Sequence, residues 1–219
     1  MHIGIIGAGN MGAALAAQLT RIGHQVAIAN SRGPQTLAGI AAETGATPVP
    51  VTEVTSKADV VIIAIPEKSI PCLPDVLLSA LPQDAVVIDT GNYVPRLRDG
   101  HIGAIDAGLP ESQWVQSQLG HPVVKAFNTI QPPSLASLGK PAGAAGRTAI
   151  PVAGDDPAAK AVVLELADQL GFDGLDAGPL ANSWRQQPGT PVFTTDLPLD
   201  AARQALANAT REQTASWRG

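Results

Sequence analysis

The chain is poor in several residue types, and each shortage excludes a class of protein. Aromatic residues make up only 3 % of its 219 residues and charged residues 15 %. Its one cysteine, Cys72, excludes an internal disulfide and a cysteine-cluster metal site. The net charge is −5 and no basic tract is present, which argues against a nucleic-acid-binding surface.

Long apolar runs are also missing. No stretch approaches the roughly 20 apolar residues that span a bilayer, and the N-terminus lacks the basic start of a signal peptide. We therefore expect a cytoplasmic protein without a membrane, nucleic-acid or metal partner. Hydrophobic residues make up 45 % of the chain, which is enough for a sizeable core built mainly from Ala, Val, Ile and Leu.

Short apolar runs alternate with helical stretches through the first half of the chain. Strands are expected at 2–6, 25–30, 46–51, 59–66 and 84–92, and helices at 11–23, 34–45 and 70–81. The strand at 59–66 is apolar throughout, as is typical of a strand covered by helices on both faces. This order predicts an α/β fold with a doubly wound, mostly parallel Rossmann sheet.

The second half continues the pattern less regularly. It predicts strands at 121–128, 148–154 and 172–178, helices at 155–171 and 199–217, and loops at 137–147 and 182–193. We expect a nucleotide-binding domain at 1–130 and a smaller C-terminal α/β extension at 131–219 within the same compact unit. The terminal helix is a candidate either for covering the core or for forming a homodimer.

The string GAGNMG, residues 7–12, follows the first strand and opens the first helix. In this context Gly7 permits a tight turn, Gly9 lets the backbone approach a pyrophosphate, and Gly12 allows close helix–strand packing. The backbone amides of Asn10 and Met11 at the helix N-terminus are expected to bind the phosphates. The alternative is a tight glycine turn without a ligand.

The second strand ends in ANSRG rather than in an acid. An NAD-preferring site places Asp or Glu at this point to bind the ribose 2′-hydroxyl, whereas Asn30 stands here. Ser31 can donate a hydrogen bond to a 2′-phosphate and Arg32 can pair with it as a planar fork. The segment therefore favours NADP(H), against the alternative of a solvated turn.

The ends of later strands are expected to line the same crevice, because ligands bind outside the carboxyl ends of parallel strands. Ile65 and Pro66 would pack against the nucleotide, and Thr90 and Asn92 would bond to the nicotinamide ribose or amide. For Asp89 a turn-capping role and a ligand role stay equally open.

Lys125 is the one charge in the apolar run VVKAF. Three placements stay open: pointing into the crevice, reaching solvent from a sheet edge, or pairing with an acid such as Asp106.

Seven segments together, GAGNMG, NSR, AIP, DTGNYVPRLRDG, VVKAFNT, PVAGDD and LGFDGLDAG, occur in this order. With them the chain resembles the coenzyme F420-dependent NADP oxidoreductases from Met1 to about Pro191. The resemblance implies hydride transfer between NADP(H) and a deazaflavin (coenzyme F420) or flavin-like ring. It also implies that residues 126–128, among them Ala126 and Asn128, line the nicotinamide crevice with Asn92. The C-terminal extension would complete the acceptor site, which the stretch LANSWRQQPGTPVF would approach.

No residue is predicted to act as a catalytic acid or base. Hydride transfer needs mainly proximity and orientation, and Asn92, Lys125 and Asn128 are the candidates for positioning. The glycine string also resembles pyrroline-5-carboxylate and imine reductases, but those enzymes have a long helical C-terminal domain, and strands are expected here. A non-catalytic module that senses NADP(H) is the third hypothesis.

Overall fold

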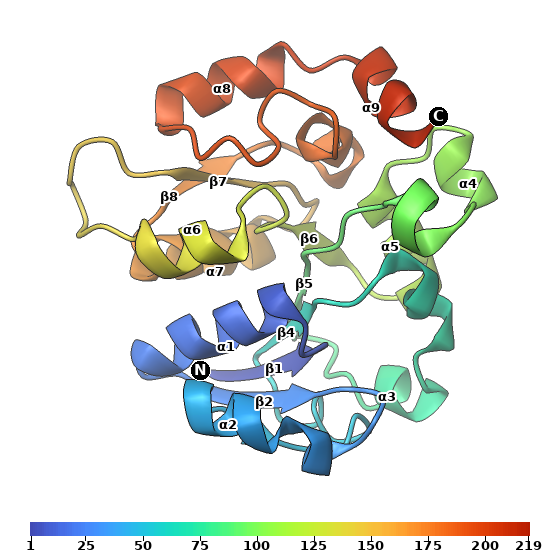
Figure 1. Ribbon diagram of the computed structural model, residues 1–219, viewed down its shortest axis with the longest axis vertical. Helices are drawn as coiled ribbons and strands as arrows, with labels where there is room; N and C mark the ends of the chain where they lie inside the picture. Colours follow the sequence, from blue (N-terminus) through green and yellow to red (C-terminus); the bar gives the residue numbers. More distant parts are fainter.

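The computed structural model describes all 219 residues, and its centre is a six-stranded parallel sheet. The strands lie in the order β3-β2-β1-β4-β5-β6, so the direction of strand order reverses between β1 and β4 (Figure 1). A sheet of this order binds ligands at that reversal, outside the carboxyl ends of its strands. The strands are β1 (His2–Ile6), β2 (Gln25–Ala29), β3 (Thr47–Pro48), β4 (Val60–Ile63), β5 (Val86–Asp89) and β6 (Val123–Lys125). The predicted doubly wound Rossmann fold is confirmed.

Alternate residues of the central strands face two separate apolar layers. Ile3 and Ile5 of β1 belong to a core with helices on one face, whereas Ile6 belongs to the core of the other face. The first layer contains α1 (Asn10–Arg21), α2 (Ala38–Thr44), α6 (Pro132–Ser137) and α7 (Pro157–Gln169); the second contains α3 (Asp75–Ser79), α4 (Gly103–Asp106) and α5 (Glu111–Leu119). Fully buried Leu15 and Leu19 fix α1 on the sheet. Burial of each side chain contributes about 1.5–3 kcal/mol to the stability of the fold.

The C-terminal part is attached to the end of this sheet. Its parallel strands β7 (Ala149–Val152) and β8 (Asp173–Asp176) are connected through α7. An antiparallel bridge joins Lys125 of β6 to Ala153, with N–O distances of 2.8 and 3.0 Å. Helix α8 (Leu199–Ala207) covers the β7–β8 pair, and α9 (Arg211–Arg218) lies beside α4 (Figure 1). The terminal stretch thus covers its own chain, while a homodimer stays a prediction.

Several predicted helices are divided. The terminal helix expected at 199–217 is two helices, because Thr210 and Gln213 form a capping box that starts α9 afresh. The helix expected at 70–81 is a 3₁₀ turn over Glu67–Cys72 followed by α3, since the prolines at 71 and 74 lack the N–H that a continuous helix needs. The helix expected at 34–45 likewise starts as a 3₁₀ turn at Pro34–Leu37.

The sequence did not predict helices α4, α5 and α6. It also missed two shorter helical turns: a π-helical turn at Pro95–Asp99 after β5, and a 3₁₀ helix at Leu180–Gln186 that overlaps the loop expected at 182–193. Both stand next to the carboxyl edge of the sheet and shape the crevice described below. No helix of the protein is both long and apolar enough to traverse a membrane.

Candidate functional site

The glycine loop between β1 and α1 is shaped by two very close backbone approaches. Gly7 has a φ of +112°, and a Cβ placed on it would lie 2.2 Å from the backbone oxygen of Ala64. A Cβ on Gly12 would lie 2.0 Å from the oxygen of Gly7. Both positions therefore exclude any side chain, and they bring the start of α1 against the ends of β1 and β4.

Gly9 is different, because a Cβ there would meet no protein atom within 4 Å. It is the N-cap of α1, which has no side-chain cap and no acid in its first turn. By contrast, Asp156 caps α7 by accepting from Ala158 N at 2.8 Å. The first-turn amides of α1 thus have neither an intrahelical nor a capping partner, and the positive end of the helix dipole faces open space. Such a helix start is suited to an anion.

A cavity of about 700 Å³ extends from this loop to the end of β2. Asn30 organises the turn there, accepting from Arg32 N at 3.0 Å and donating to Thr36 Oγ1 at 2.9 Å. Ser31 and Arg32 line the cavity, are exposed, and Arg32 makes no ion pair. The guanidinium is therefore free for an anionic ligand.

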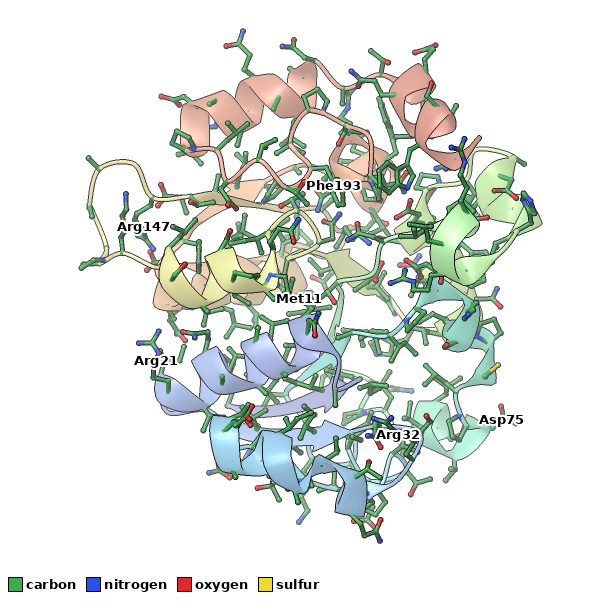
Figure 2. All side chains as sticks on the ribbon, in the orientation of Figure 1. Met11, Arg21, Arg32, Asp75, Arg147 and Phe193 are labelled. Atoms are coloured by element: carbon green, nitrogen blue, oxygen red, sulfur yellow. The ribbon has the colours of Figure 1, made fainter.

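A second cavity, of about 410 Å³, lies on the other side of the glycine loop. It shares four residues with the first, so the two form one continuous crevice: Gly9, Ala64, Ile65 and Pro66. Figure 2 shows Met11, at the start of α1, between Arg32 at one end and Phe193 at the other. The crevice follows the carboxyl edge of the sheet across the point where the strand order reverses.

An amide network holds the inner wall of the second cavity. Asn92 Nδ2 donates to the backbone oxygen of Asn128 at 3.0 Å, and Asn128 Nδ2 returns a bond to Asn92 Oδ1 at 3.0 Å. Buried Gln186 donates to Asn128 Oδ1 at 3.0 Å and accepts from Asn128 Nδ2 through its backbone oxygen at 2.7 Å. Asn92 and Asn128, predicted from separate segments, are thus brought together and fixed in orientation.

Two predicted positions lie away from the crevice surface. Ala126 is fully buried in the core and lines neither cavity. Lys125 is fully buried and pairs with Asp89, Nζ to Oδ2 at 3.0 Å, and donates to Gly91 O at 2.6 Å. Of the placements left open for Lys125, pairing with an acid is confirmed. The suggested partner was wrong, because Asp106 lies near Tyr93 and His101 instead.

The Lys125–Asp89 pair is the centre of a buried charge cluster directly beneath Gly91. Asp89 Oδ1 accepts from Gly91 N at 2.8 Å, so Asp89 has the turn-capping role, and Oδ2 accepts from Ser112 Oγ at 2.7 Å. Burial alone would lower the pKa of the Lys125 ammonium, but the facing carboxylates, chiefly Asp89, hold it above its ordinary value. Lys125 therefore stays charged and fixes the backbone at Gly91, rather than touching a ligand.

Two further acids of the cluster, Glu67 and Glu111, have raised pKa values. Burial raises the pKa of Glu67 well above its ordinary value, and the Asp89 carboxylate adds to the rise. Neither carboxyl oxygen of Glu67 has a hydrogen-bond partner. Burial also raises the pKa of Glu111 to about 7 against the opposing attraction of Lys125, and Glu111 Oε2 accepts from Tyr93 N at 3.2 Å. The cluster is thus a rigid polar support for the loop that carries Asn92.

Six lining residues of the second cavity were not singled out from the sequence: Arg98, Ile130, Gln131, Pro132, Phe193 and Thr194. Arg98 lies in the segment RLRDG and donates to the backbone oxygen of Asn92 and to Asp99 Oδ2, the latter at 2.9 Å. Arg98 could have been singled out from the sequence, because RLRDG belongs to one of the segments that carry the family resemblance. Phe193 ends the stretch expected near a second substrate, but Gln131 and Thr194 carried no signal in the sequence.

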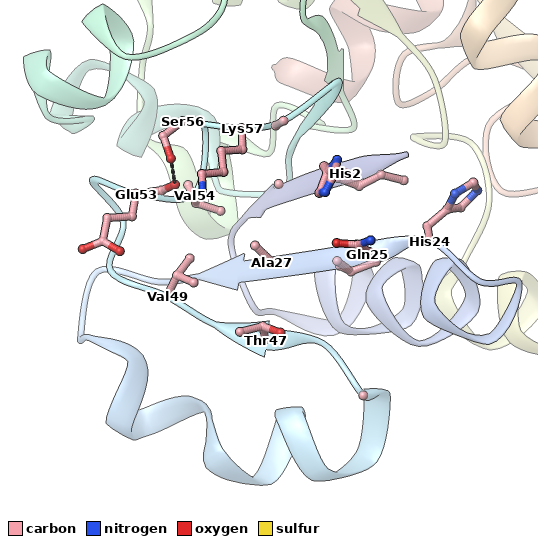
Figure 3. Close-up of a pocket in the computed structure, with 15 residues that line it drawn as sticks. His2, His24, Gln25, Ala27, Thr47, Val49, Glu53, Val54, Ser56 and Lys57 are labelled. Carbon is pink, nitrogen blue, oxygen red and sulfur yellow. Dashed lines mark hydrogen bonds between the residues drawn. The ribbon is translucent and has the colours of Figure 1, made fainter.

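A cavity of about 550 Å³ lies elsewhere, on the face of β1 and β2 near their amino ends. Figure 3 shows Gln25, Ala27 and Val49 on one side of it and the 53–57 segment on the other. None of the glycine-loop residues lines it. Although His2 and His24 border it, no group of three or more His, Cys, Asp or Glu side chains in the protein is placed to hold a metal ion.

Comparison with known proteins agrees with this geometry. Residues 2–93, which contain the glycine loop and the strand ends up to Asn92, match the family described as NADP oxidoreductase, coenzyme F420-dependent. A 56-residue segment is 50 % identical to the Escherichia coli (strain K12) protein YjhV, covering 26 % of this chain and 41 % of YjhV. The chain thus aligns with less than half of that curated relative.

Solved structures extend the similarity over nearly the whole chain. The hypothetical protein SMa0349 from Sinorhizobium meliloti is 32 % identical with a TM-score of 0.77, covering 90 % of this chain and 95 % of that one. A candidate F420-dependent NADP reductase from Arthrobacter sp. FB24 is 24 % identical with a TM-score of 0.68, covering 83 % and 86 %, and supports the fold. With the crevice, the glycine loop and these matches in place, the chain belongs to the family of NADP oxidoreductases described as coenzyme F420-dependent.

Proposed function

We propose that the protein transfers hydride between NADP(H) and a deazaflavin such as coenzyme F420, or a flavin-like acceptor. The observation that carries the proposal is the continuous crevice across the sheet's reversal point, with an uncapped helix start in its middle. A dinucleotide needs that arrangement, because its pyrophosphate lies between two ends that differ in chemistry. In this chain the unpaired guanidinium of Arg32 lies at one end of the crevice and the hydrogen-bonded amides of Asn92 and Asn128 lie at the other.

The nucleotide half is assigned by charge. The first-turn amides of α1, at Asn10 and Met11, would receive the pyrophosphate beside Gly9. Ser31 and Arg32 would bind the 2′-phosphate, and no acid stands at the end of β2 to repel it. Ile65 and Pro66, which border both cavities, would pack against the nucleotide between the two ends.

The other half positions the reacting rings. NADPH, when bound, supplies a hydride from its nicotinamide ring to the acceptor, which also takes up a proton. The Asn92–Asn128 pair presents amide groups whose orientation Gln186 fixes, and Lys125 and Asp89 hold the backbone next to them. Such a site accelerates hydride transfer by proximity and orientation, so a catalytic acid in the crevice is not required.

The pyrroline-5-carboxylate and imine reductase alternative gains nothing from the C-terminal architecture. Those enzymes complete their sites with a long helical domain. After Asn128 this chain instead forms the β7–β8 pair, and its longest helix there is the 13-residue α7. The NADP(H)-sensing alternative differs from the proposal in turnover alone, and the acceptor assay described below separates the two.

The 2′-phosphate assignment is tested with Arg32→Ala. Loss of one charge-assisted contact of about 1.5–3 kcal/mol should weaken NADPH binding roughly 10- to 150-fold and leave NADH binding within about twofold. Titration calorimetry measures both. The matched control is Arg21→Ala, an equally exposed arginine at the far end of α1 (Figure 2), which should change neither affinity. Equal affinities of the unmodified protein for NADPH and NADH would contradict the assignment.

The acceptor is tested by anaerobic NADPH oxidation with coenzyme F420, FMN, FAD, ferric chelates and cyclic imines. Turnover with a deazaflavin or flavin supports the proposal. Turnover with imines alone would favour the reductase alternative, and tight NADPH binding without any turnover would favour the sensing module.

A further inference from the structure

The acceptor end of the crevice is walled by an aromatic pair. Phe193 lines the cavity, and Trp217 of α9 packs edge-on against it, with ring centroids 6.0 Å apart and planes at 65°. The Trp217 indole Nε1 also donates to the backbone oxygen of Tyr93 at 3.1 Å. Trp217 therefore connects Phe193 to the loop after β5, whose residue Asn92 lines the same cavity.

Arginines at both ends of α9 strengthen this connection. Arg218 donates to the backbone oxygen of Ile105 at 2.7 Å and to Gln187 Oε1 at 3.1 Å. Arg211 donates to the backbone oxygen of Gly108 at 3.0 Å. Helix α9 thus joins two segments, 93–108 and 184–193, that are far apart in the sequence and flank the crevice from two sides.

The backbone around Phe193 is held in a costly conformation. The three non-glycine residues of the protein with positive φ are Phe127 (60°), Thr194 (56°) and Asp196 (48°), and all lie in segments that border this cavity. Thr194 N donates to Thr129 O at 2.8 Å, and Ser134 Oγ donates to Asp196 Oδ2 at 2.6 Å. Strained residues persist only where surrounding contacts fix them, and they gather at ligand sites. The backbone next to Phe193 is therefore fixed, and Trp217 packs against the Phe193 ring itself.

We propose that Phe193 is a specificity-determining residue against which the planar ring of the acceptor packs, and that Trp217 is the residue that positions it. This inference rests on the proposed function, because it concerns the acceptor half of the same crevice. A cavity lined by both an aromatic ring and a pair of fixed amides favours a flat, partly polar ring, since aromatic rings gain both buried area and pair geometry on contact. The wall selects for a deazaflavin or flavin and against a small, non-aromatic cyclic imine.

The inference is tested by binding, which is independent of turnover. The protein is saturated with NADP⁺ and titrated with FMN and with coenzyme F420, and probe fluorescence gives the dissociation constant. Phe193→Leu should weaken binding of the planar probe about tenfold, and Trp217→Ala should weaken it by several fold. Phe193→Tyr and Trp217→Phe keep an aromatic ring and should stay near the unmodified protein. Val76→Ala, which trims an exposed apolar side chain on α3, is the control.

A structural effect is separated from a positioning effect by NADP⁺ affinity, which should stay within about twofold in every variant. Unchanged probe binding in Phe193→Leu, or an equal loss of NADP⁺ binding, would overturn the inference. Failure of both planar probes to bind the unmodified protein would overturn it as well. In that case NADPH oxidation with another acceptor class separately decides whether the hydride-transfer proposal stands, so the two failures remain distinguishable.

Discussion

Glu111→Gln should make the protein more stable at alkaline pH and change it little at acidic pH. Burial raises the pKa of Glu111 from 4.5 to about 7 in the folded protein. Between these values the unfolded chain releases the proton first, so the folded state binds more protons and stability falls as pH rises. Raising the pKa from 4.5 to about 7 lowers the free energy of unfolding by roughly 3 kcal/mol at high pH. The full loss is reached above pH 7, and well below pH 4.5 there is no loss.

The glutamine removes this penalty without removing the hydrogen bond, because its amide oxygen can still accept from Tyr93 N. The advantage of Glu111→Gln in free energy of unfolding should be about 1 kcal/mol at pH 5 and about 3 kcal/mol at pH 8. Urea denaturation at both pH values measures it, and the exposed Glu43→Gln is the control because it relieves no buried charge. An advantage independent of pH, or a loss at pH 8, would refute the argument that burial raises the pKa of Glu111.

Two further predictions concern the support beneath the crevice and the glycine loop. Lys125→Met should lower the free energy of unfolding, measured by urea denaturation, by about 3–5 kcal/mol because it leaves Asp89 buried without its partner. Adding Asp89→Asn should restore part of that loss. If the losses of the two single variants simply add in the double variant, direct pairing is contradicted. Gly9→Val should keep the melting temperature, because a Cβ at this position meets only the open crevice, yet it should abolish NADPH binding. The control Gly39→Val on α2 should keep both the melting temperature and NADPH binding. Retained binding in Gly9→Val would place the nucleotide elsewhere.

The nucleotide half of the crevice was predictable because its signals are local. The tight turn at Gly7 and the close packing at Gly12 each need a glycine at a fixed distance from the strand end, and the backbone shows both constraints. Ser31 and Arg32 follow β2 directly, so strand direction alone places them at the carboxyl edge. Their contact with a nucleotide stays a prediction.

Lys125 and Ala126 show where the sequence of a strand fails to predict the placement of its side chains. Lys125 was a candidate because it is the one charge in an apolar run, and Ala126 was carried over from the family resemblance. Both side chains are fully buried, and neither lines the crevice. The carboxylate that would neutralise a buried lysine could not be chosen from sequence, because Asp89 ends a strand and Asp106 ends helix α4, and no local pattern shows which of them lies beside Lys125. Only the register of β5 against β6, which sets Asp89 beside Lys125, decides between them.

By itself the sequence determined the succession of strands along the chain, the parallel doubly wound sheet, the glycine loop and the absence of an acid after the second strand. These follow from residue periodicity and from turn chemistry, which act over a few neighbouring residues. The tertiary structure decided the buried charge cluster under Gly91 and the acceptor wall of Asn92, Asn128, Phe193 and Trp217. Those features depend on segments up to 124 residues apart meeting in space, as the bond from Trp217 to Tyr93 shows, and no local pattern specifies such a contact.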